Sequence, residues 1–200
     1  MNLGVIASNR GTNLQAIVDA CREKRLDAKV SVAISNNSKS LAILRARKAG
    51  IPAFHISEKT HPSPLDLDQA ILNILNTHDV DFVVLAGYLK HMGKKTLLAF
   101  PKKVINIHPS LLPSYGGKGM YGRKIHEAVL KNRDTETGIT IHYVDDGYDT
   151  GEIISQLRIP IDSSDSVTSL TNRILKQEHE FLIATLNCLI SKERSCRNTV

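Results

Sequence analysis

The chain has 200 residues, of which 42% are hydrophobic and 23% charged, which is typical of a single folded domain and excludes a disordered or fibrous protein. No apolar run approaches the roughly 20 residues of a membrane helix, and the first residues do not resemble a signal peptide. Lysine and arginine outnumber acidic residues by 26 to 20, which suits an anionic partner, but they are dispersed rather than clustered as in a nucleic-acid footprint, and phosphorylated small molecules or polyanionic cofactors fit the charge equally well.

The first half of the chain alternates short apolar segments with segments of helical periodicity. Strands are predicted at residues 3–7, 30–34, 53–56 and 81–86. Helices are predicted from residue 14 onward, at 41–49 and at 65–77. Such alternation is typical of right-handed βαβ units, so we expect an α/β fold with a doubly wound, mostly parallel, Rossmann-like sheet.

The second half is less regular. Strands are predicted at residues 103–107, 138–144 and 153–161, and helices at 124–131 and from 165 to about 191. A loop rich in proline and glycine connects the first of these strands to the first of these helices, over residues 108–122. Because no repeat or linker is evident, we expect one domain over residues 1–191 and a C-terminal tail over residues 192–200.

Residues 8–13 form a polar, glycine-containing turn between the first strand and the first helix. Backbone N–H groups and the positive helix end would face this turn, and Gly11, Thr12 and Asn13 would allow a phosphate to approach. A capped helix start without a ligand explains the same residues equally well. The turn lacks the glycine patterns of dinucleotide-binding loops and P-loops, so neither NAD nor ATP is indicated.

Asn106 and His108 lie at the carboxyl end of a predicted strand, where open α/β sheets bind their ligands. Two residues apart on an extended chain, they share one face. An amide donor beside a titratable imidazole suits a carbonyl oxygen that gains negative charge, and Pro109 and Pro113 would stiffen the geometry. The alternative is a histidine that is merely hydrogen-bonded in a loop.

A strand leading into an acidic, glycine-flanked loop spans residues 142–151. Such loops are often simple solvated turns. An aspartate near His108 would instead favour the imidazolium and raise its pKa. His142 closes the strand, where it would either pack in the core or, less favoured, brace Asp149.

Glu178 lies near the centre of an apolar stripe on the last predicted helix, where a carboxylate requires a partner. That partner is either a neighbouring cation or the hydroxyl groups of a ligand. Asp165 and Ser166, at the start of the same helix, are typical of helix capping.

The other histidines show no spacing typical of zinc ligands, so no metal site is predicted; they are His55, His61, His78, His91, His126 and His179. The three cysteines likewise lack metal-ligand spacing and are odd in number, which favours a reducing cytoplasm; they are Cys21, Cys188 and Cys196.

The turn at 8–13, the run at 106–113 and Asp149 followed by Thr150 and Gly151 together resemble the phosphoribosylglycinamide formyltransferases, folate-dependent enzymes of purine synthesis. The resemblance covers nearly the whole chain, and the Asn-x-His-Pro-Ser-Leu-Leu-Pro run is highly specific. It implies that Asn106, His108 and Asp149 are catalytic.

The resemblance also assigns the ligand contacts. It implies that glycinamide ribonucleotide is bound by Gly11, Thr12, Asn13, Leu175, Lys176, Gln177 and Glu178. It implies that the co-substrate 10-formyltetrahydrofolate is bound by Leu89, Lys90, His91, Met92, Asn106, Asp145, Asp146, Gly147, Tyr148 and Asp149.

The chain departs from the family pattern at several positions. Lys90 and His91 replace an arginine and an aliphatic residue, so pterin contacts there would come from the backbone. Pro64 replaces an arginine that often helps to hold the cofactor. The loop 116–122 is longer and richer in glycine than in some members.

The implied reaction transfers the formyl group to the amine of glycinamide ribonucleotide by direct attack, without a metal or a covalent enzyme intermediate. Alternatives are a methionyl-tRNA formyltransferase, a hydrolase of the same folate, and a non-catalytic nucleotide- or folate-binding module. The first two carry further domains that are not evident in these 200 residues. We expect small-molecule substrates, neither nucleic acid nor membrane as partners, a cytoplasmic location, and a monomer or homodimer.

Overall fold

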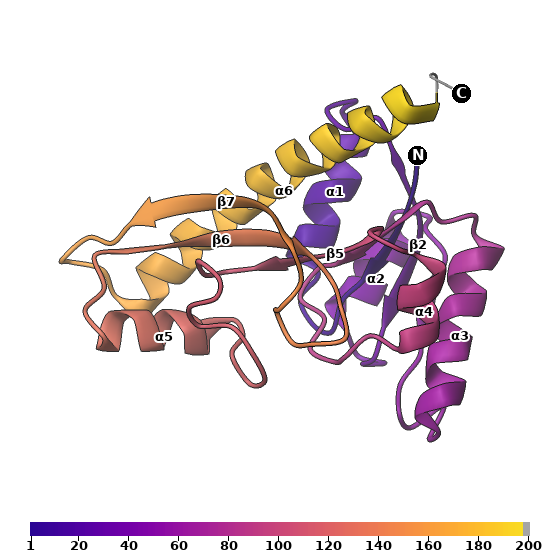
Figure 1. Cartoon of the computed structure of the whole chain (residues 1–200), viewed down its shortest axis with the longest axis horizontal. Helices are drawn as coiled ribbons and strands as arrows, with labels where there is room; N and C mark the ends of the chain where they lie inside the picture. Colours follow the sequence, from indigo (N-terminus) through magenta and orange to yellow (C-terminus); the bar gives the residue numbers. More distant parts are fainter. Residues whose placement is uncertain (198–200) are drawn as a thin grey trace.

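Seven strands form one sheet in the computed structural model, which describes residues 1–197 (Figure 1). The strands are β1 (Asn2–Ile6), β2 (Lys29–Ser35), β3 (Ala53–His55), β4 (Phe82–Leu85), β5 (Val104–His108), β6 (Glu136–Tyr143) and β7 (Ile153–Pro160). The helices are α1 (Thr12–Arg22), α2 (Leu41–Lys48), α3 (Pro64–Thr77), α4 (Lys94–Ala99), α5 (Arg123–Lys131) and α6 (Val167–Arg197).

The strand order is β3-β2-β1-β4-β5-β6-β7. The pairs from β3 to β5 are parallel, whereas β6 runs antiparallel to both β5 and β7. This arrangement confirms the predicted doubly wound, mostly parallel sheet. The chain winds outward from β1 to β3 and then returns to place β4 on the other side of β1, so a crevice is expected beyond the carboxyl ends of β1 and β4.

Both faces of the sheet are buried, because successive strand side chains point to opposite sides. In β4, Phe82 and Val84 pack with residues of α1, α2 and α6, whereas Val83 and Leu85 pack with residues of α3. Figure 1 shows α1 and α6 side by side, with α3 and α4 together at the other side of the molecule. The apolar strand β4 is thus covered by helices on both faces.

Three elements differ from the prediction. The short helix α4 was not expected, and its first turn is capped from another helix by Asp68, which accepts hydrogen bonds from the N–H groups of Lys95 at 2.7 Å and Thr96 at 3.2 Å. Strand β6 begins at Glu136 instead of residue 138. Helix α6 continues to Arg197, so residues 192–197 of the predicted tail are helical, and residues 198–200 lie outside the described part.

None of the helices within residues 1–197 combines the length and the apolar character that a membrane crossing would need.

Candidate active site

A cavity of about 780 Å³ lies at the carboxyl ends of β1, β4 and β5. Its volume is in the range of small-molecule sites. The segments that line it come from the whole length of the chain; they are residues 9–13, 85–92, 106–109, 117–123 and 147–149, together with side chains of α5, β6 and α6. The switch point of the sheet therefore coincides with this cavity.

Strand periodicity brings Asn106 and His108 to the cavity. Ile107, between them, is buried in the core cluster that contains residues of α1 and α6, and the segment 106–108 lines the cavity. His108 is 4% exposed. The predicted shared face of these two side chains is present.

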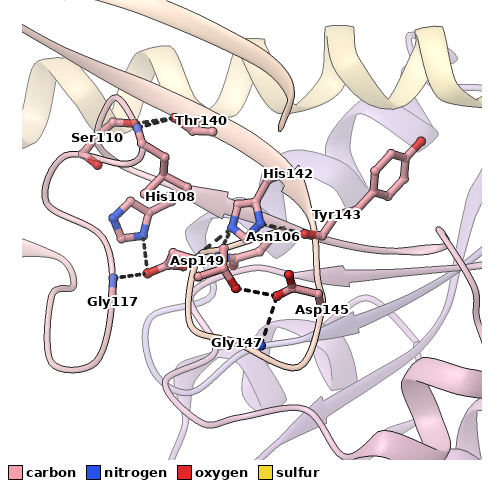
Figure 2. A network of polar contacts seen from close by, with 12 residues as sticks. Asn106, His108, Ser110, Gly117, Thr140, His142, Tyr143, Asp145, Gly147 and Asp149 are labelled. Atoms are coloured by element: carbon pink, nitrogen blue, oxygen red, sulfur yellow. Dashed lines mark hydrogen bonds and ion pairs between the residues drawn. The ribbon is translucent and has the colours of Figure 1, made fainter. Parts of the chain in front are cut away.

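Asp149 joins both of these side chains (Figure 2). Its Oδ1 atom accepts a hydrogen bond from Asn106 Nδ2 at 3.3 Å, and its Oδ2 atom lies 3.5 Å from His108 Nδ1. The backbone N–H of Gly117 also donates to Oδ2, at 3.0 Å. Asp149 has a φ of +57°, a conformation that is costly for a non-glycine residue and is held by these contacts.

His142 lies opposite Asn106 in the β5–β6 ladder. Its Nδ1 atom is 2.8 Å from the carbonyl oxygen of Tyr143, which can only accept, so Nδ1 carries a hydrogen. Nε2 then accepts from Asn106 Nδ2 at 3.1 Å and lies 3.6 Å from Asp149 Oδ1. His142 is buried, and Asn106 Nδ2 donates to both His142 Nε2 and Asp149 Oδ1, so His142 supports the position of Asp149 by way of Asn106.

The pKa of His108 lies below its ordinary value, because burial disfavours the charged imidazole. Asp149 and the carbonyl of Tyr115, which accepts from His108 Nε2 at 2.9 Å, act in the opposite direction but more weakly. The expectation that Asp149 leaves His108 with a raised pKa is therefore wrong in its net direction. His108 is a neutral imidazole at pH 7, with its hydrogen on Nε2.

Asp149 itself is ionised. Burial works to raise its pKa, but the polar contacts around the carboxylate, including the hydrogen bond from the N–H of Gly117, outweigh burial and hold the pKa below the ordinary value. The site thus combines an anionic carboxylate with a neutral imidazole whose Nδ1 is free to accept a proton.

The first helix begins directly at the cavity. Gly11 precedes α1 with a φ of +65°, and no side chain caps the helix. A Cβ atom at Gly11 would lie 2.6 Å from the Cα atom of Ala42, so only glycine fits this position. The uncapped N–H groups of the first turn suit an anion, which is one of the two alternatives that the sequence leaves open.

Glu178 is 8% exposed and lines the cavity on α6. Burial raises its pKa to about 7, which a hydrogen bond from the side chain of Asn13 partly offsets. The Oδ1 atom of Asn13 is buried without a hydrogen-bond partner. Glu178 therefore has a neutral amide rather than a cation as its neighbour, which leaves ligand groups as its remaining predicted partner.

The other predicted contacts divide into two groups. The residues that line the cavity are Leu89, Lys90, His91, Met92, Gly147, Tyr148 and Leu175. The residues that do not are Asp145, Asp146, Lys176 and Gln177. Lys176 and Gln177 are exposed because the helical rotation of 100° per residue turns them away from the face of α6 that borders the cavity.

Asp145 and Asp146 shape the loop instead. Asp145 Oδ1 accepts from the N–H of Gly147 at 3.0 Å and from the hydroxyl of Thr150 at 2.7 Å. The backbone carbonyl of Asp146 lies 3.0 Å from His91 Nε2, which joins this loop to the one after β4. These contacts hold the loop that positions Asp149.

Sequence reasoning missed several residues of the site. Ser8 fixes the loop after β4, because its hydroxyl accepts from the N–H of Leu89 at 2.9 Å. Tyr115 acts through its backbone carbonyl, which carries no sequence signal. His126 on α5 lines the cavity, although only its lack of zinc-like spacing was considered. Within residues 1–197, no cluster of three or more metal-ligating side chains is present.

Comparisons with known proteins match this architecture. The family model described as "Formyl transferase" matches residues 1–186. A "Phosphoribosylglycinamide formyltransferase" of Bacillus subtilis is 37% identical over 186 residues, covering 93% of each chain. One of Haemophilus influenzae is 38% identical, covering 89% of this chain and 82% of the relative.

Two chloroplastic plant relatives are longer. The chain is 39% identical to the one from Vigna unguiculata and 36% identical to the one from Arabidopsis thaliana, and it spans 60% and 64% of their respective lengths. Among solved structures, a phosphoribosylglycinamide formyltransferase from Bacillus halodurans is 35% identical, with a TM-score of 0.89 and coverage of 96% of this chain and 97% of that one.

Proposed function

We propose a formyl transfer reaction for this chain, because it belongs to the formyl transferase family. The proposed donor is 10-formyltetrahydrofolate and the proposed acceptor is the amine of glycinamide ribonucleotide, which gives the N-formyl product and tetrahydrofolate in purine synthesis. The observation that carries the proposal is the convergence of Asn106, His108 and Asp149 in one cavity with the uncapped start of α1.

The start of α1 would bind the phosphate of the ribonucleotide. The N–H groups of Thr12 and Asn13 lie in its uncapped first turn, where the helix dipole is positive. Arg10 and Lys118 add positive charge to the lining of the same cavity. Glu178 and the unpartnered Oδ1 atom of Asn13 would accept hydrogen bonds from other parts of this substrate.

The loops after β4 and β6 would hold the folate. Leu85, Leu89, Met92 and Val144 supply apolar side chains to the cavity lining, which suits a flat heterocycle. The backbone N–H and C=O groups of residues 87–92 are close in sequence to these apolar side chains and would supply the polar contacts to the same ligand. Pro64 does not line the cavity.

Asn106 and His108 would stabilise the charge that develops when the amine attacks the formyl carbon. The formyl oxygen becomes negative in this step, and the Nδ2 group of Asn106 is an amide donor beside it in the proposed pose. Its 3.3 Å bond to Asp149 is the longer of its two contacts and the easier one to exchange.

His108 would act first as a proton acceptor and then as a donor. The attacking nitrogen becomes acidic as its bond to carbon forms, and we propose that its proton reaches Nδ1 of His108 by way of Asp149 or a water. The imidazolium then forms as the oxyanion forms, and the oxyanion replaces the neutral carbonyl of Tyr115 as the acceptor of the Nε2 hydrogen. Asp149 stabilises this transient cation across 3.5 Å. When the tetrahedral intermediate collapses, the bond between the formyl carbon and N10 of the folate breaks, and the proton held by His108 passes to N10, which releases tetrahydrofolate and restores the neutral imidazole.

The proposal is tested by offering the protein different acceptors for the formyl group. Purified protein receives 10-formyltetrahydrofolate with glycinamide ribonucleotide, with initiator methionyl-tRNA, or with neither, and formylated products and formate are quantified by mass spectrometry. Formylation of the ribonucleotide supports the proposal. Formylation of the tRNA, release of formate alone, or binding without turnover would each favour one of the alternatives.

Partners and location follow as parts of the same proposal. Small molecules are the proposed ligands, with neither nucleic acid nor membrane as a partner. The free thiols of Cys21 and Cys188 suit a reducing cytoplasm. Whether the chain is a monomer or a homodimer stays a prediction.

A further inference from the structure

His126 is a buried polar residue that the mechanism above does not use. It lies in the first half of helix α5, is 3% exposed, and lines the same cavity as the catalytic residues. Its Nδ1 atom has no hydrogen-bond partner in the described residues. Buried polar groups are nearly always hydrogen-bonded, so an unpartnered nitrogen in a side chain that lines a ligand cavity points to a partner that the ligand supplies.

The imidazole of His126 is neutral under physiological conditions. Burial alone lowers its pKa to about 4. A neutral ring offers one hydrogen-bond donor and one acceptor but no charge to attract a phosphate. Its expected partner is therefore a neutral polar group, such as a hydroxyl or an amide.

A second unpartnered atom lines this cavity. The Oδ1 atom of Asn13, on α1, is also buried without a partner, and Asn13 contacts the protonatable Glu178 on α6. Helices α5 and α6 pack against each other, and Thr171 of α6 also lines the cavity. Three helices thus present uncharged or protonatable polar groups to one ligand space.

We propose that His126 hydrogen-bonds, through Nδ1, a hydroxyl or amide group of glycinamide ribonucleotide, and that this contact contributes to selection of the ribonucleotide. This inference rests on the proposed function. The contact is separate from the phosphate, which α1 would bind, and from the reacting amine, which Asn106 and His108 would face.

The experiment measures ligand binding and thermal stability of His126→Phe and His126→Asn. Phenylalanine removes the ring nitrogens, whereas asparagine keeps a polar atom near the position of Nδ1. Isothermal titration should show about tenfold weaker binding of glycinamide ribonucleotide to the Phe variant, with partial recovery in the Asn variant. Affinity for inorganic phosphate and for 10-formyltetrahydrofolate should not change. Ribose 5-phosphate distinguishes the two possible partners of His126. If its binding to the Phe variant is weakened to the same extent, the partner is a ribose hydroxyl. If its binding is unchanged, the partner is the amide of the glycinamide group.

Stability separates this role from a structural one. The Phe variant should melt at the same temperature as the wild type or higher, because it removes an unsatisfied buried atom. His78→Phe is the matched control, since His78 Nδ1 is bonded to the carbonyl of Ile74 on α3; it should melt lower and bind the ribonucleotide normally.

Two results would overturn the inference while leaving the proposed function intact. One is equal affinity of the wild type and the Phe variant for glycinamide ribonucleotide. The other is a Phe variant that melts lower and loses affinity for both substrates equally. Failure of the wild type itself to bind glycinamide ribonucleotide would instead remove the proposed function and this inference together.

Discussion

His108 is subject to two opposing effects on its pKa. Burial favours the neutral imidazole, and the nearby carboxylate of Asp149 favours the imidazolium. In the free protein the effect of burial is larger, so the pKa of His108 is lowered and the neutral form is favoured. In the transition state the developing oxyanion adds a second negative charge, which would favour the imidazolium. His108 is thus suited to take up a proton during the reaction rather than before it.

This account predicts the pH dependence of kcat/KM. Because the pKa of His108 lies below 6.5, the neutral form dominates at and above neutral pH. Activity should therefore fall as the pH drops through this lowered pKa and should stay level from pH 7 to 8. A steady-state pH profile checks it, and a loss of activity as the pH rises from 6 to 7 would show that the free enzyme needs the imidazolium instead.

Glu178 offers a prediction about stability. Its folded pKa of about 7 lies above the ordinary value of 4.5, so the folded state binds more protons between these values, and its contribution to stability is lost as the pH rises from about 4.5 to 7. Glu178→Gln, which removes the ionisation, should be more stable than the wild type at pH 8 by ~3 kcal/mol. Thermal or urea unfolding at pH 4.5 and 8 measures this, and an equal difference at both values would contradict it.

Single residues differ in how well their place in the site could be predicted. Asn106 and His108 were predictable, because strand alternation fixes their shared face. The contact between Tyr115 and His108 was not, since a backbone carbonyl has no signature in the sequence. The net pKa of His108 also depends on burial by segments distant in the chain, which a local pattern does not contain.

At the scale of elements, the start of α1 is the feature most sensitive to a single change. Gly11 combines a φ of +65° with close contact to Ala42 on α2. Gly50 has a similar φ of +74° but nothing within 4 Å of an added Cβ, so it isolates the cost of backbone strain.

Gly11→Ala should therefore cost more than Gly50→Ala. Backbone strain accounts for ~1 kcal/mol in each, and the clash with α2 adds a further penalty only at Gly11. Only Gly11→Ala should also weaken binding of glycinamide ribonucleotide, because it displaces the first turn of α1. Urea unfolding and titration calorimetry of both variants test this, and equal effects at the two glycines would refute it.

Elements were predictable where their own sequence determines them. The buried strand β4 and the long helix α6 have clear apolar patterns. Helix α4 does not, because it has only 6 residues and its cap, Asp68, comes from α3. The end of α6 was placed too early, since exposed polar residues near a helix end show no stop signal.

At the scale of the whole molecule, the sheet assembles the site. Asn106 and Asp149 are 43 residues apart in sequence and are joined because β6 runs antiparallel beside β5 and its following loop returns to the cavity. The doubly wound topology predicted the position of the site, but not which loop residues reach it. Asp145 and Asp149 belong to the same loop, and only the three-dimensional path of that loop separates the structural from the catalytic carboxylate.

The most direct test of the central claim is the rate of formyl transfer to glycinamide ribonucleotide, measured under saturating substrates, in His108→Ala and Asp149→Ala. Both variants should keep the wild-type circular dichroism spectrum and lose about 10²- to 10³-fold in kcat. His61→Ala, which changes a histidine that does not line the cavity, should keep the wild-type rate. A kcat within fivefold of the wild type in either catalytic-site variant would contradict the account.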